Sequence, residues 1–314
     1  MKAIYIKQYG DKEQLIYGEL PKPQIAPQQV LIKVAAAGIN PVDFHVRNGM
    51  FKDSDMHQLP LILGWDAAGE IAEIGKDVSQ FAVGDKVFTF APIAGQGAYA
   101  EFLTVDADFV SVKPNNLDMA SSAAVPLAAL TAWQGLMTEG KLQAGQRVLI
   151  HNASGAVGQF AVQMAKQAGA EVIATASSRK RDLVLSLGAD EFIDYRNESF
   201  EDKATDVDLV FAAMGGNDIL PRSLKTLKSG GRLVSTFDEI PHAEASALGI
   251  EFIRMWVKPS QQELVILKEL IEQGQLRVKI DSIFPWEQVK LAHERSENQL
   301  AVGKIVLNID PTQF

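Results

Sequence analysis

The feature that most constrains the fold is a glycine-containing turn between a short apolar strand and an amphipathic helix. The sequence predicts the strand over Arg147–His151 and the helix over Val157–Gln167. Gly155 and Gly158 fill two positions of a G-x-G-x-x-G pattern, and Ala153 takes the first. In that setting one glycine lets the backbone approach a pyrophosphate and the other lets the helix pack on the strand. An ordinary tight turn is the alternative. We predict a phosphate-binding turn made of Ser154, Gly155, Ala156, Val157 and Gly158.

Strands and helices alternate after this turn. Alternation of this kind predicts a parallel, doubly wound sheet with helices on both faces. Ser260–Gly274 carries helix start and stop signals, with Ser260 as a suitable N-cap. The predicted strands are Glu171–Ala176, Glu191–Asp194, Asp208–Ala213, Arg232–Phe237 and Glu251–Val257, with helices over Lys180–Leu187 and Ile219–Leu227.

The first 110 residues show a different pattern, of short strands separated by Gly, Pro and Asp, which predicts a barrel or sandwich. A helical pattern follows over Met119–Leu136, and a helix and a strand are predicted after Pro285, with the strand over Lys304–Ile309. We expect this last part to return to the first domain. The predicted strands are Val30–Val34, Gly69–Gly75, Lys86–Phe90, Tyr99–Val105 and Phe109–Val112, and the predicted domains are 1–118 (completed by 278–314) and 119–277.

The end of the second predicted strand of the parallel sheet favours one dinucleotide. NAD-binding folds place an Asp or Glu about 20 residues past the glycines, where it accepts from the ribose 2′-OH. Here the chain has Ser177, Ser178 and Arg179 instead, with no carboxylate before Asp182. Arg179 suits a 2′-phosphate, which a carboxylate would repel. The alternative is a solvated basic start to a helix, which has the wrong sign for the helix dipole. We therefore predict NADP(H).

Composition excludes several classes. The chain has 314 residues, a net charge of −9 and no cysteine. Without cysteine there is no disulfide framework and no thiolate nucleophile or zinc ligand. An acidic chain lacks the basic face of a general nucleic-acid binder. Its longest apolar run, Ala123–Leu130, is far short of a membrane span of roughly 20 residues. We expect a cytoplasmic protein that binds neither nucleic acid nor membrane.

At this point the chain resembles the zinc-independent quinone oxidoreductase branch of the medium-chain dehydrogenase/reductase superfamily. The resemblance covers nearly the whole chain. Each of its landmark motifs is weak evidence alone, and the resemblance is specific because they occur together in this order. It implies a GroES-like β-rich catalytic domain around an inserted Rossmann domain, a cleft between them and a homodimer. The landmarks are Gly38–Asp43, Pro60–Gly69, Val83–Val87, Gly97–Glu101, Leu130–Trp133, Ala153–Gly158, Leu187–Asp190, Asp194–Tyr195 and Gly303–Lys304.

The resemblance also predicts that no metal takes part. The zinc-dependent branch binds its catalytic metal through a Cys and a His in the first domain, and the matching segments here contain Asn40 and Trp65. Neither side chain replaces thiolate or imidazole on zinc. The five histidines show no metal-binding spacing. What remains is hydride transfer to an electron-poor small molecule, a quinone or an activated α,β-unsaturated carbonyl compound.

Three residues are candidates for catalysis. The resemblance places Asn40 and Asp43 beside the nicotinamide and the substrate, where the Asn40 amide can donate to a developing oxyanion. A plain turn at Asn40 and a helix cap at Asp43 are the alternatives. Relatives often carry tyrosines in the stretch that matches Phe44–Phe51, where this chain has His45 and Phe51. His45 is therefore a candidate proton donor, with a surface histidine or solvent protonation as alternatives.

The resemblance adds further cofactor contacts. Thr131 matches a residue near the carboxamide, and Tyr195 matches one at the 2′-phosphate end. Thr236 and Phe237 match the nicotinamide side, and Lys304 matches a C-terminal contact. The sequence thus predicts an NADPH-dependent reductase of quinones or enones. Two alternatives stay open: a 2-alkenal or enone double-bond reductase with little quinone activity, and a non-catalytic NADPH-binding protein on the same fold.

Overall fold

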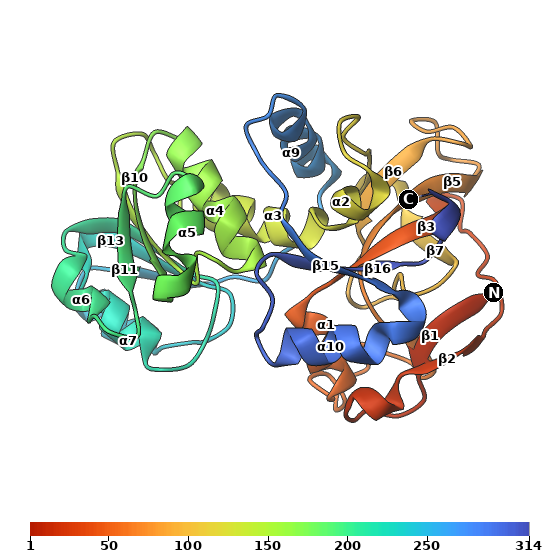
Figure 1. The fold of residues 1–314 in the computed structure, drawn as a ribbon, viewed down its shortest axis with the longest axis horizontal. Coiled ribbons are helices and arrows are strands. Elements are labelled where there is room, and N and C mark those ends of the chain that lie inside the picture. Colours follow the sequence, from red (N-terminus) through yellow and green to blue (C-terminus); the bar gives the residue numbers. More distant parts are fainter. Residues whose placement is uncertain (314) are drawn as a thin grey trace. The chain divides into compact units, whose positions relative to one another are not determined.

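The structure is a computed structural model that describes residues 1–313. It divides into two compact units. Unit 1 comprises Met1–Leu127, Lys258–Gly274 and 278–313, and unit 2 comprises Ala128–Val257 and Gln275–Arg277. Figure 1 shows the elements of each. The sequence placed 119–127 and 258–274 with the dinucleotide-binding domain, so the observed boundaries differ from the expected ones.

Two packed helices account for that difference. Helix α2 (Met119–Ala123) packs on strands β3 and β5 of unit 1, and helix α9 (Gln261–Glu272) packs on β8. Hydrogen bonds fix α9 there: the Asn115 amide donates to Glu272 (2.9 Å), and the Asn116 side chain donates to the Ile271 carbonyl (3.0 Å). Both helices carry apolar faces that the sequence shows, but their partner strands lie far away in the chain.

Unit 1 is built on two sheets. The larger has the order β15-β16-β3-β5-β6-β8, with β7 also on β3, and the smaller has the order β2-β1-β4. Strand β16, from the end of the chain, pairs with β3, and β15 pairs with β16 (Figure 1). The strands are β1 (Lys2–Ile6), β2 (Ile16–Glu19), β3 (Gln29–Ile39), β4 (Leu61–Ile62), β5 (Asp66–Ile74), β6 (Lys86–Phe90), β7 (Phe102–Asp106), β8 (Val110–Val112), β15 (Ile280–Pro285) and β16 (Lys304–Asn308).

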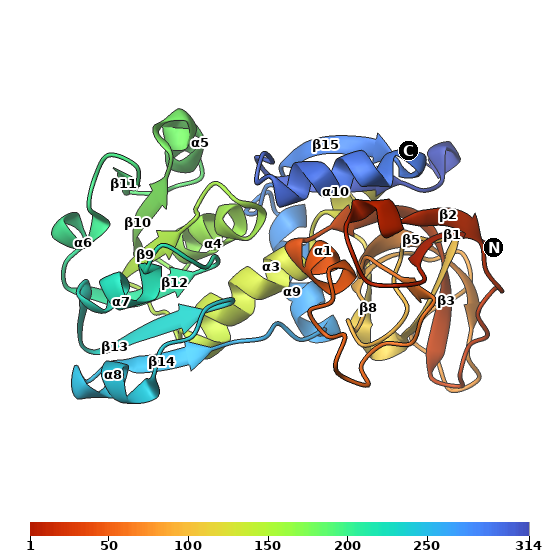
Figure 2. The same cartoon turned by 90° about the horizontal axis from the view of Figure 1, so that it is seen from below.

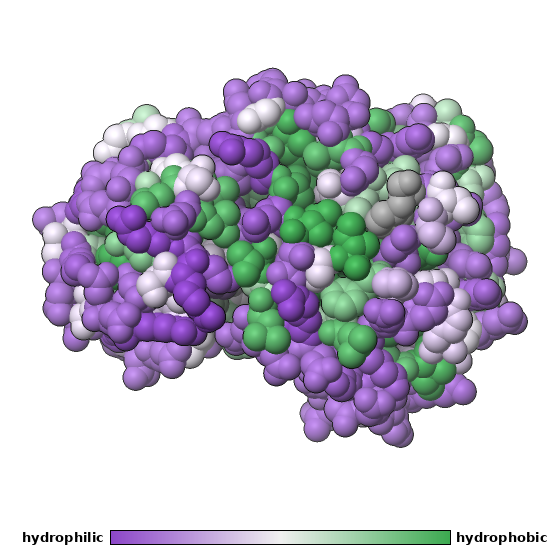
Figure 3. Space-filling model, viewed as in Figure 1, coloured by the Kyte–Doolittle hydropathy of each residue, from purple (hydrophilic) through white to green (hydrophobic). Residues whose placement is uncertain are grey.

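Two further helices belong to unit 1, namely α1 (Pro41–Arg47) and α10 (Val289–Glu297). The sequence placed the start of α10 at Pro285, but β15 ends there and a short 3-10 turn intervenes. In the view of Figure 3 apolar surface gathers over β15 and α10, where Ile283 and Leu291 are exposed. No helix within residues 1–313 is long and apolar enough to cross a membrane.

Unit 2 is a six-stranded parallel sheet with the order β11-β10-β9-β12-β13-β14. Helices α4 and α5 lie on one face, and α7 and α8 lie on the other (Figure 2). Leu149, Ile173 and Val210 fill the core between sheet and helices. The strands are β9 (Arg147–His151), β10 (Glu171–Ala176), β11 (Glu191–Asp194), β12 (Val207–Ala212), β13 (Leu227–Ser235) and β14 (Glu251–Arg254), and the helices are α4 (Ala156–Gln167), α5 (Arg181–Ser186), α6 (Phe200–Lys203), α7 (Ile219–Leu224) and α8 (His242–Ala247).

One predicted helix is interrupted. The sequence predicts continuous helix over Met119–Leu136, whereas α2 ends at Ala123 and α3 covers Pro126–Trp133. A π-helical segment, Gln134–Glu139, follows. Pro126 has no N–H to donate to the preceding turn, and its ring clashes with that turn, so the first helix ends before it.

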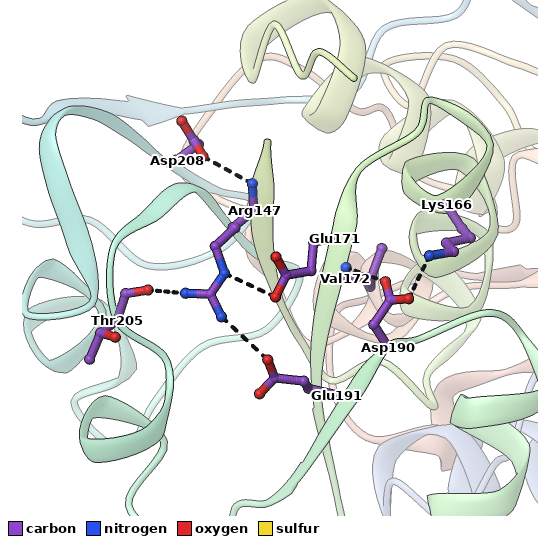
Figure 4. Close-up of polar contacts among 8 residues, drawn as sticks. All are labelled: Arg147, Lys166, Glu171, Val172, Asp190, Glu191, Thr205 and Asp208. Carbon is purple, nitrogen blue, oxygen red and sulfur yellow. Dashed lines mark hydrogen bonds and ion pairs between the residues drawn. The ribbon is translucent and has the colours of Figure 1, made fainter. Parts of the chain in front are cut away.

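The amino ends of the parallel strands are joined by charged side chains (Figure 4). Arg147, the first residue of β9, donates to Glu171 and Glu191, the first residues of the two strands beyond it (3.0 and 3.3 Å). Its backbone amide donates to Asp208 on β12 (2.9 Å). Both glutamates are partly exposed, so each of these two ion pairs contributes at most about 1 kcal/mol. This edge joins neighbouring strands, and most of the cofactor candidates of unit 2 lie at the opposite edge.

Candidate functional site

The glycine turn has the local structure that the sequence predicted. Strand β9 ends at His151, Asn152 takes a left-handed conformation (φ 52°), and α4 begins directly after Gly155. A Cβ at Gly158 would lie 2.2 Å from the Asn152 carbonyl oxygen. Only glycine therefore fits at this point, where the helix packs against the turn.

The first turn of α4 fits a pyrophosphate. Residues Ser154 to Val157 are partly exposed, and Gly155 caps the helix without a side-chain hydrogen bond. The first backbone N–H groups of a helix have no partner within it and lie at its positive end. A Cβ at Gly155 would approach the Asn152 side-chain nitrogen to 2.7 Å. The absence of a side chain at Gly155 thus keeps the turn compact. The Gly155 N–H itself donates to the Asn152 carbonyl (2.9 Å), and the N–H groups of the next residues, at the start of α4, are open to an anion.

The other cofactor candidates of unit 2 mostly follow strands of the same sheet. Because the strands are parallel, the segments after β9, β10, β11 and β13 lie at one edge. Ser177 is buried, whereas Ser178 and Arg179 are exposed. Tyr195 is half exposed, and Arg196 donates to its hydroxyl (3.4 Å). Thr236 is half-buried and Phe237 is exposed, both directly after β13, and Thr131 is buried on α3.

A carboxylate that the sequence did not single out lies at this edge. Asp194 pairs in register with Ala176, the last residue of β10. Its oxygens accept from the Asn197 side chain (2.7 Å), from the Arg196 amide (3.2 Å) and from Ser178. These donors satisfy the Asp194 carboxylate within the turn. The position of Asp194 at this edge follows from the pairing of β10 with β11. Its distance along the chain from the glycine turn does not predict that position.

In unit 1 three neighbouring strand ends bring together a buried polar cluster of Asn40, Asp66 and Lys304. Asn40 directly follows β3, Asp66 begins β5 and Lys304 begins β16, and β3 pairs with both of the other strands. The Asn40 side-chain amide donates to Asp66 (2.9 Å), and Lys304 donates to the Asn40 amide oxygen (2.5 Å) and to Asp66 (3.1 Å). Asp66 also accepts from the Leu127 amide (2.7 Å).

Burial makes this cluster unusual. Asn40 and Lys304 are each 2 % exposed, and Asp66 is fully buried. Burial raises the pKa of Asp66, while the Lys304 ammonium and the hydrogen bonds oppose the rise. The sequence also allowed a solvated lysine at Lys304, and the structure contradicts that alternative. Its cofactor contact stays a prediction.

Asp43 organises the start of α1 from a fully buried position. One of its oxygens accepts from the backbone N–H of Asn40 (2.8 Å) and from the Tyr99 hydroxyl (2.7 Å). The other oxygen, Oδ1, has no hydrogen-bond partner among the described residues. Burial raises the pKa of Asp43 to about 7, against the hydrogen bonds from Asn40 and Tyr99. Asp43 is thus the third residue of the helix and reaches back to the backbone amide before it, rather than standing before the helix as its cap.

His45 lies on the same helix, half-buried, with its ring 4.3 Å from that of Phe44. Burial lowers the pKa of His45, and the nearby Glu297 carboxylate opposes this. The imidazole is therefore mostly neutral near pH 7. Further along the helix, buried Arg47 donates to His293 Nδ1 (3.0 Å) and pairs with Glu297. No sequence pattern predicts this second buried group, because Arg47 lies about 250 residues from His293 and Glu297.

The donor set in unit 1 does not fit zinc. The Trp65 indole N–H donates to the Gly95 carbonyl (3.1 Å), and the Asn40 amide oxygen accepts from the Lys304 ammonium. An indole N–H is not a metal ligand, and an ammonium beside the amide oxygen repels a cation. Within residues 1–313 no three His, Cys, Asp or Glu side chains form a group that would hold a metal.

Comparisons with known proteins cover both ends of the chain and most of its length. Residues 26–115 match the alcohol dehydrogenase GroES-like domain, and residues 187–307 match a family described as zinc-binding dehydrogenase. An Arabidopsis thaliana protein named NADPH-dependent alkenal/one oxidoreductase, chloroplastic, is 35% identical over 98% of this chain and 79% of its own length. Human quinone oxidoreductase is 32% identical over 98% of this chain and 97% of its own length. This chain belongs to the quinone oxidoreductase branch of the medium-chain dehydrogenase/reductase superfamily.

A solved structure of this branch confirms the fold class. The quinone oxidoreductase from Coxiella burnetii superposes with a TM-score of 0.91 at 34% identity, covering 99% of both chains. The GroES-like β-rich unit and the parallel-sheet Rossmann unit are therefore both as predicted. The family description "zinc-binding" belongs to the matched family, and the cysteine-free chain with Asn40 and Trp65 in the ligand segments departs from it.

Proposed function

We propose that this chain is an NADPH-dependent oxidoreductase that transfers hydride, without a metal, to quinones or activated α,β-unsaturated carbonyl compounds. The observation that carries the proposal is a relationship, over 98% of this chain, to proteins named NADPH-dependent alkenal/one oxidoreductase and quinone oxidoreductase. The partly exposed first turn of α4 and the buried cluster of Asn40, Asp66 and Lys304 support it. NADPH, when bound, supplies the hydride.

The residues of the chain hold and polarise the reactants. The turn of Ser154 to Val157 holds the pyrophosphate through the N–H groups at the start of α4, and Gly155 leaves room for it. Arg179 pairs with the 2′-phosphate, flanked by Ser177, Ser178 and Tyr195. Thr131, Thr236 and Phe237 complete the cofactor contacts. As hydride adds to the electron-poor carbon, negative charge develops on the substrate oxygen, and the Asn40 amide donates to that oxygen. A proton from water, or from His45, then completes the reduced product.

Arg179→Ala tests the cofactor assignment. Losing a charged hydrogen bond to the 2′-phosphate will weaken NADPH binding by about 2 kcal/mol and leave NADH binding nearly unchanged. Fluorescence titration of both dinucleotides measures this. Lys228→Ala is the matched control, because Lys228 pairs with Asp208 at the opposite edge of the sheet. Equal weakening of NADPH and NADH would contradict the 2′-phosphate role.

Asn40→Ala tests the catalytic assignment. Removing one oxyanion donor is expected to lower kcat by about 10²–10³-fold while the Kd for NADPH stays within about twofold. Asn48→Ala, at the exposed far end of α1, serves as control. Unchanged turnover in Asn40→Ala with NADPH still bound would contradict the assignment of Asn40 to the active site.

A second candidate is a double-bond reductase for 2-alkenals and enones with little quinone activity. The name of the Arabidopsis thaliana relative favours it. Steady-state kcat/KM with NADPH on a naphthoquinone and on an enal separates the two. A ratio above about 100 in either direction decides between them, since it corresponds to about 2.7 kcal/mol of transition-state discrimination.

We further propose a homodimer in the cytoplasm. Strand β14 is an edge strand of the parallel sheet and pairs only with β13 among the described residues. An open edge of this kind is a template for pairing with another chain, and a second copy would use it. Light scattering of the purified chain tests the dimer, and cell fractionation tests the location.

A further inference from the structure

The cluster of Asn40, Asp66 and Lys304 has two hydrogen-bond donors left over. A Lys ammonium has three N–H groups, and Lys304 uses two of them, on Asn40 and Asp66. The Asn40 amide has two N–H groups and uses one, on Asp66. Among residues 1–313 neither the third N–H of Lys304 nor the second N–H of Asn40 meets an acceptor. Both side chains belong to residues that are only 2 % exposed, where an unused donor is costly and calls for a partner.

The orientation of the Asn40 side-chain amide is fixed by the charges around it. Lys304 only donates and an ionised Asp66 only accepts, so the Asn40 amide has to face Lys304 with its oxygen and Asp66 with its nitrogen. The Leu127 amide holds the other oxygen of Asp66. Three strand ends of one sheet carry the group, which leaves little freedom to reorient. Such a preorganised pair of donors requires no rearrangement when an anion forms beside it.

We infer that Lys304 is a second catalytic residue: its ammonium, together with the Asn40 amide, binds the substrate oxygen and stabilises the negative charge that develops there during hydride transfer. This assignment rests on the proposed function and deepens it. The ligand class is a planar conjugated carbonyl compound, which becomes an enolate or a hydroquinone anion. Hydride adds to the carbon, the π electrons move to the oxygen, and Lys304 keeps its proton while water supplies the one that completes the product.

The local charges support this role for Lys304. Asp66 balances the resting ammonium charge but divides its oxygens among three donors, from Asn40, Lys304 and Leu127. A full positive charge within hydrogen-bond distance of a substrate oxygen acts more strongly in a buried site than in water. It supplies the polarisation for which the zinc-dependent branch uses a metal, at segments where this chain has Asn40 and Trp65.

The test uses 4-nitrophenolate as a stand-in for the anionic product and 4-nitrotoluene as its neutral isostere. The wild-type chain is expected to bind the phenolate at least about 10-fold more tightly than the isostere, equivalent to about 1.4 kcal/mol. The double variant Lys304→Met/Asp66→Asn removes the ammonium without leaving a buried charge alone, and it is expected to lose the preference. Lys304→Arg is expected to keep it. The control is Lys33→Met, which removes from strand β3 a partly exposed ion pair with Asp310.

A second measurement needs no variant. The absorbance of 4-nitrophenol bound to the wild-type chain is expected to report ionisation at a lower pH than that of the free probe, by about one pH unit for a tenfold preference. Equal affinities for the two probes, an unshifted titration, or a double variant that keeps the preference would overturn the assignment. Wild-type turnover of quinone and enal with NADPH is measured in parallel. Absent turnover with an intact phenolate preference rejects the proposed function alone, and turnover without that preference rejects the role of Lys304 alone.

Discussion

Replacing Lys304 by methionine will lower the free energy of unfolding by about 3–5 kcal/mol. The substitution removes the ammonium from a cluster in which the two charged partners are 2 % and 0 % exposed. Asp66 is then left as a buried carboxylate without a counter-charge. This uncompensated charge, rather than the lost contact with Lys304, accounts for most of the loss of stability. Chemical denaturation followed by tryptophan fluorescence measures the change. Lys33→Met, which breaks a partly exposed pair, is expected to change the same free energy by about 1 kcal/mol or less.

A second substitution separates this explanation from simple loss of packing. Lys304→Met/Asp66→Asn removes both charges and leaves a neutral side-chain amide whose oxygen can still accept from the Leu127 amide. If the buried charge is the cause, the double variant is expected to regain most of the stability that Lys304→Met loses. Equal stability of the single and double variants would show that the side-chain volume of Lys304, rather than its charge, stabilises unit 1.

The parallel sheet was predictable because its signals are local. Strands β9, β10 and β11 begin and end at the predicted residues, and Gly155 and Gly158 mark the turn between strand and helix. Periodicity, glycine spacing and strand length all act within about ten residues there. The cofactor candidates after these strands follow from the parallel order, since parallel strands end at one edge.

The candidate catalytic cluster was predictable only in part. Asn40 and Lys304 were singled out by resemblance, but their direct contact and the role of Asp66 depend on the pairing of β16, β3 and β5. Those strands are separated by up to about 260 residues, and no sequence pattern reports their register. Tyr99, which donates to Asp43, lacks any local signal for the same reason. The prediction of one continuous helix over Met119–Leu136 was wrong, because the helix is interrupted before Pro126. Pro126 is a local signal for this break, but the helical periodicity of the apolar residues around it favoured a continuous helix.

Asp43 is expected to give the protein an unfolding free energy that falls as the pH rises. Its pKa is about 7 in the folded chain, raised by burial, against about 3.9 in an unfolded chain. Between these values the folded state holds a proton that the unfolded state releases, so raising the pH favours unfolding. The stabilisation is complete below about pH 4 and is lost as the pH passes 7. A gap of about three pH units, at 1.36 kcal/mol each, amounts to about 4 kcal/mol.

The comparison with Asp43→Asn isolates this contribution. His151 and His293 are buried, and burial lowers the pKa of each to about 3, so they make the folded state less stable as the pH falls below about 6.5. This opposite trend is present in both proteins and cancels in their difference. Relative to the wild-type chain, Asp43→Asn is expected to gain about 4 kcal/mol between pH 4 and pH 8, because asparagine accepts from Asn40 and Tyr99 at any pH. Denaturant titrations of both proteins across this range give the difference directly. A constant difference would mean that Asp43 stays ionised in the folded chain, with the hydrogen bonds from Asn40 and Tyr99 outweighing the cost of its burial.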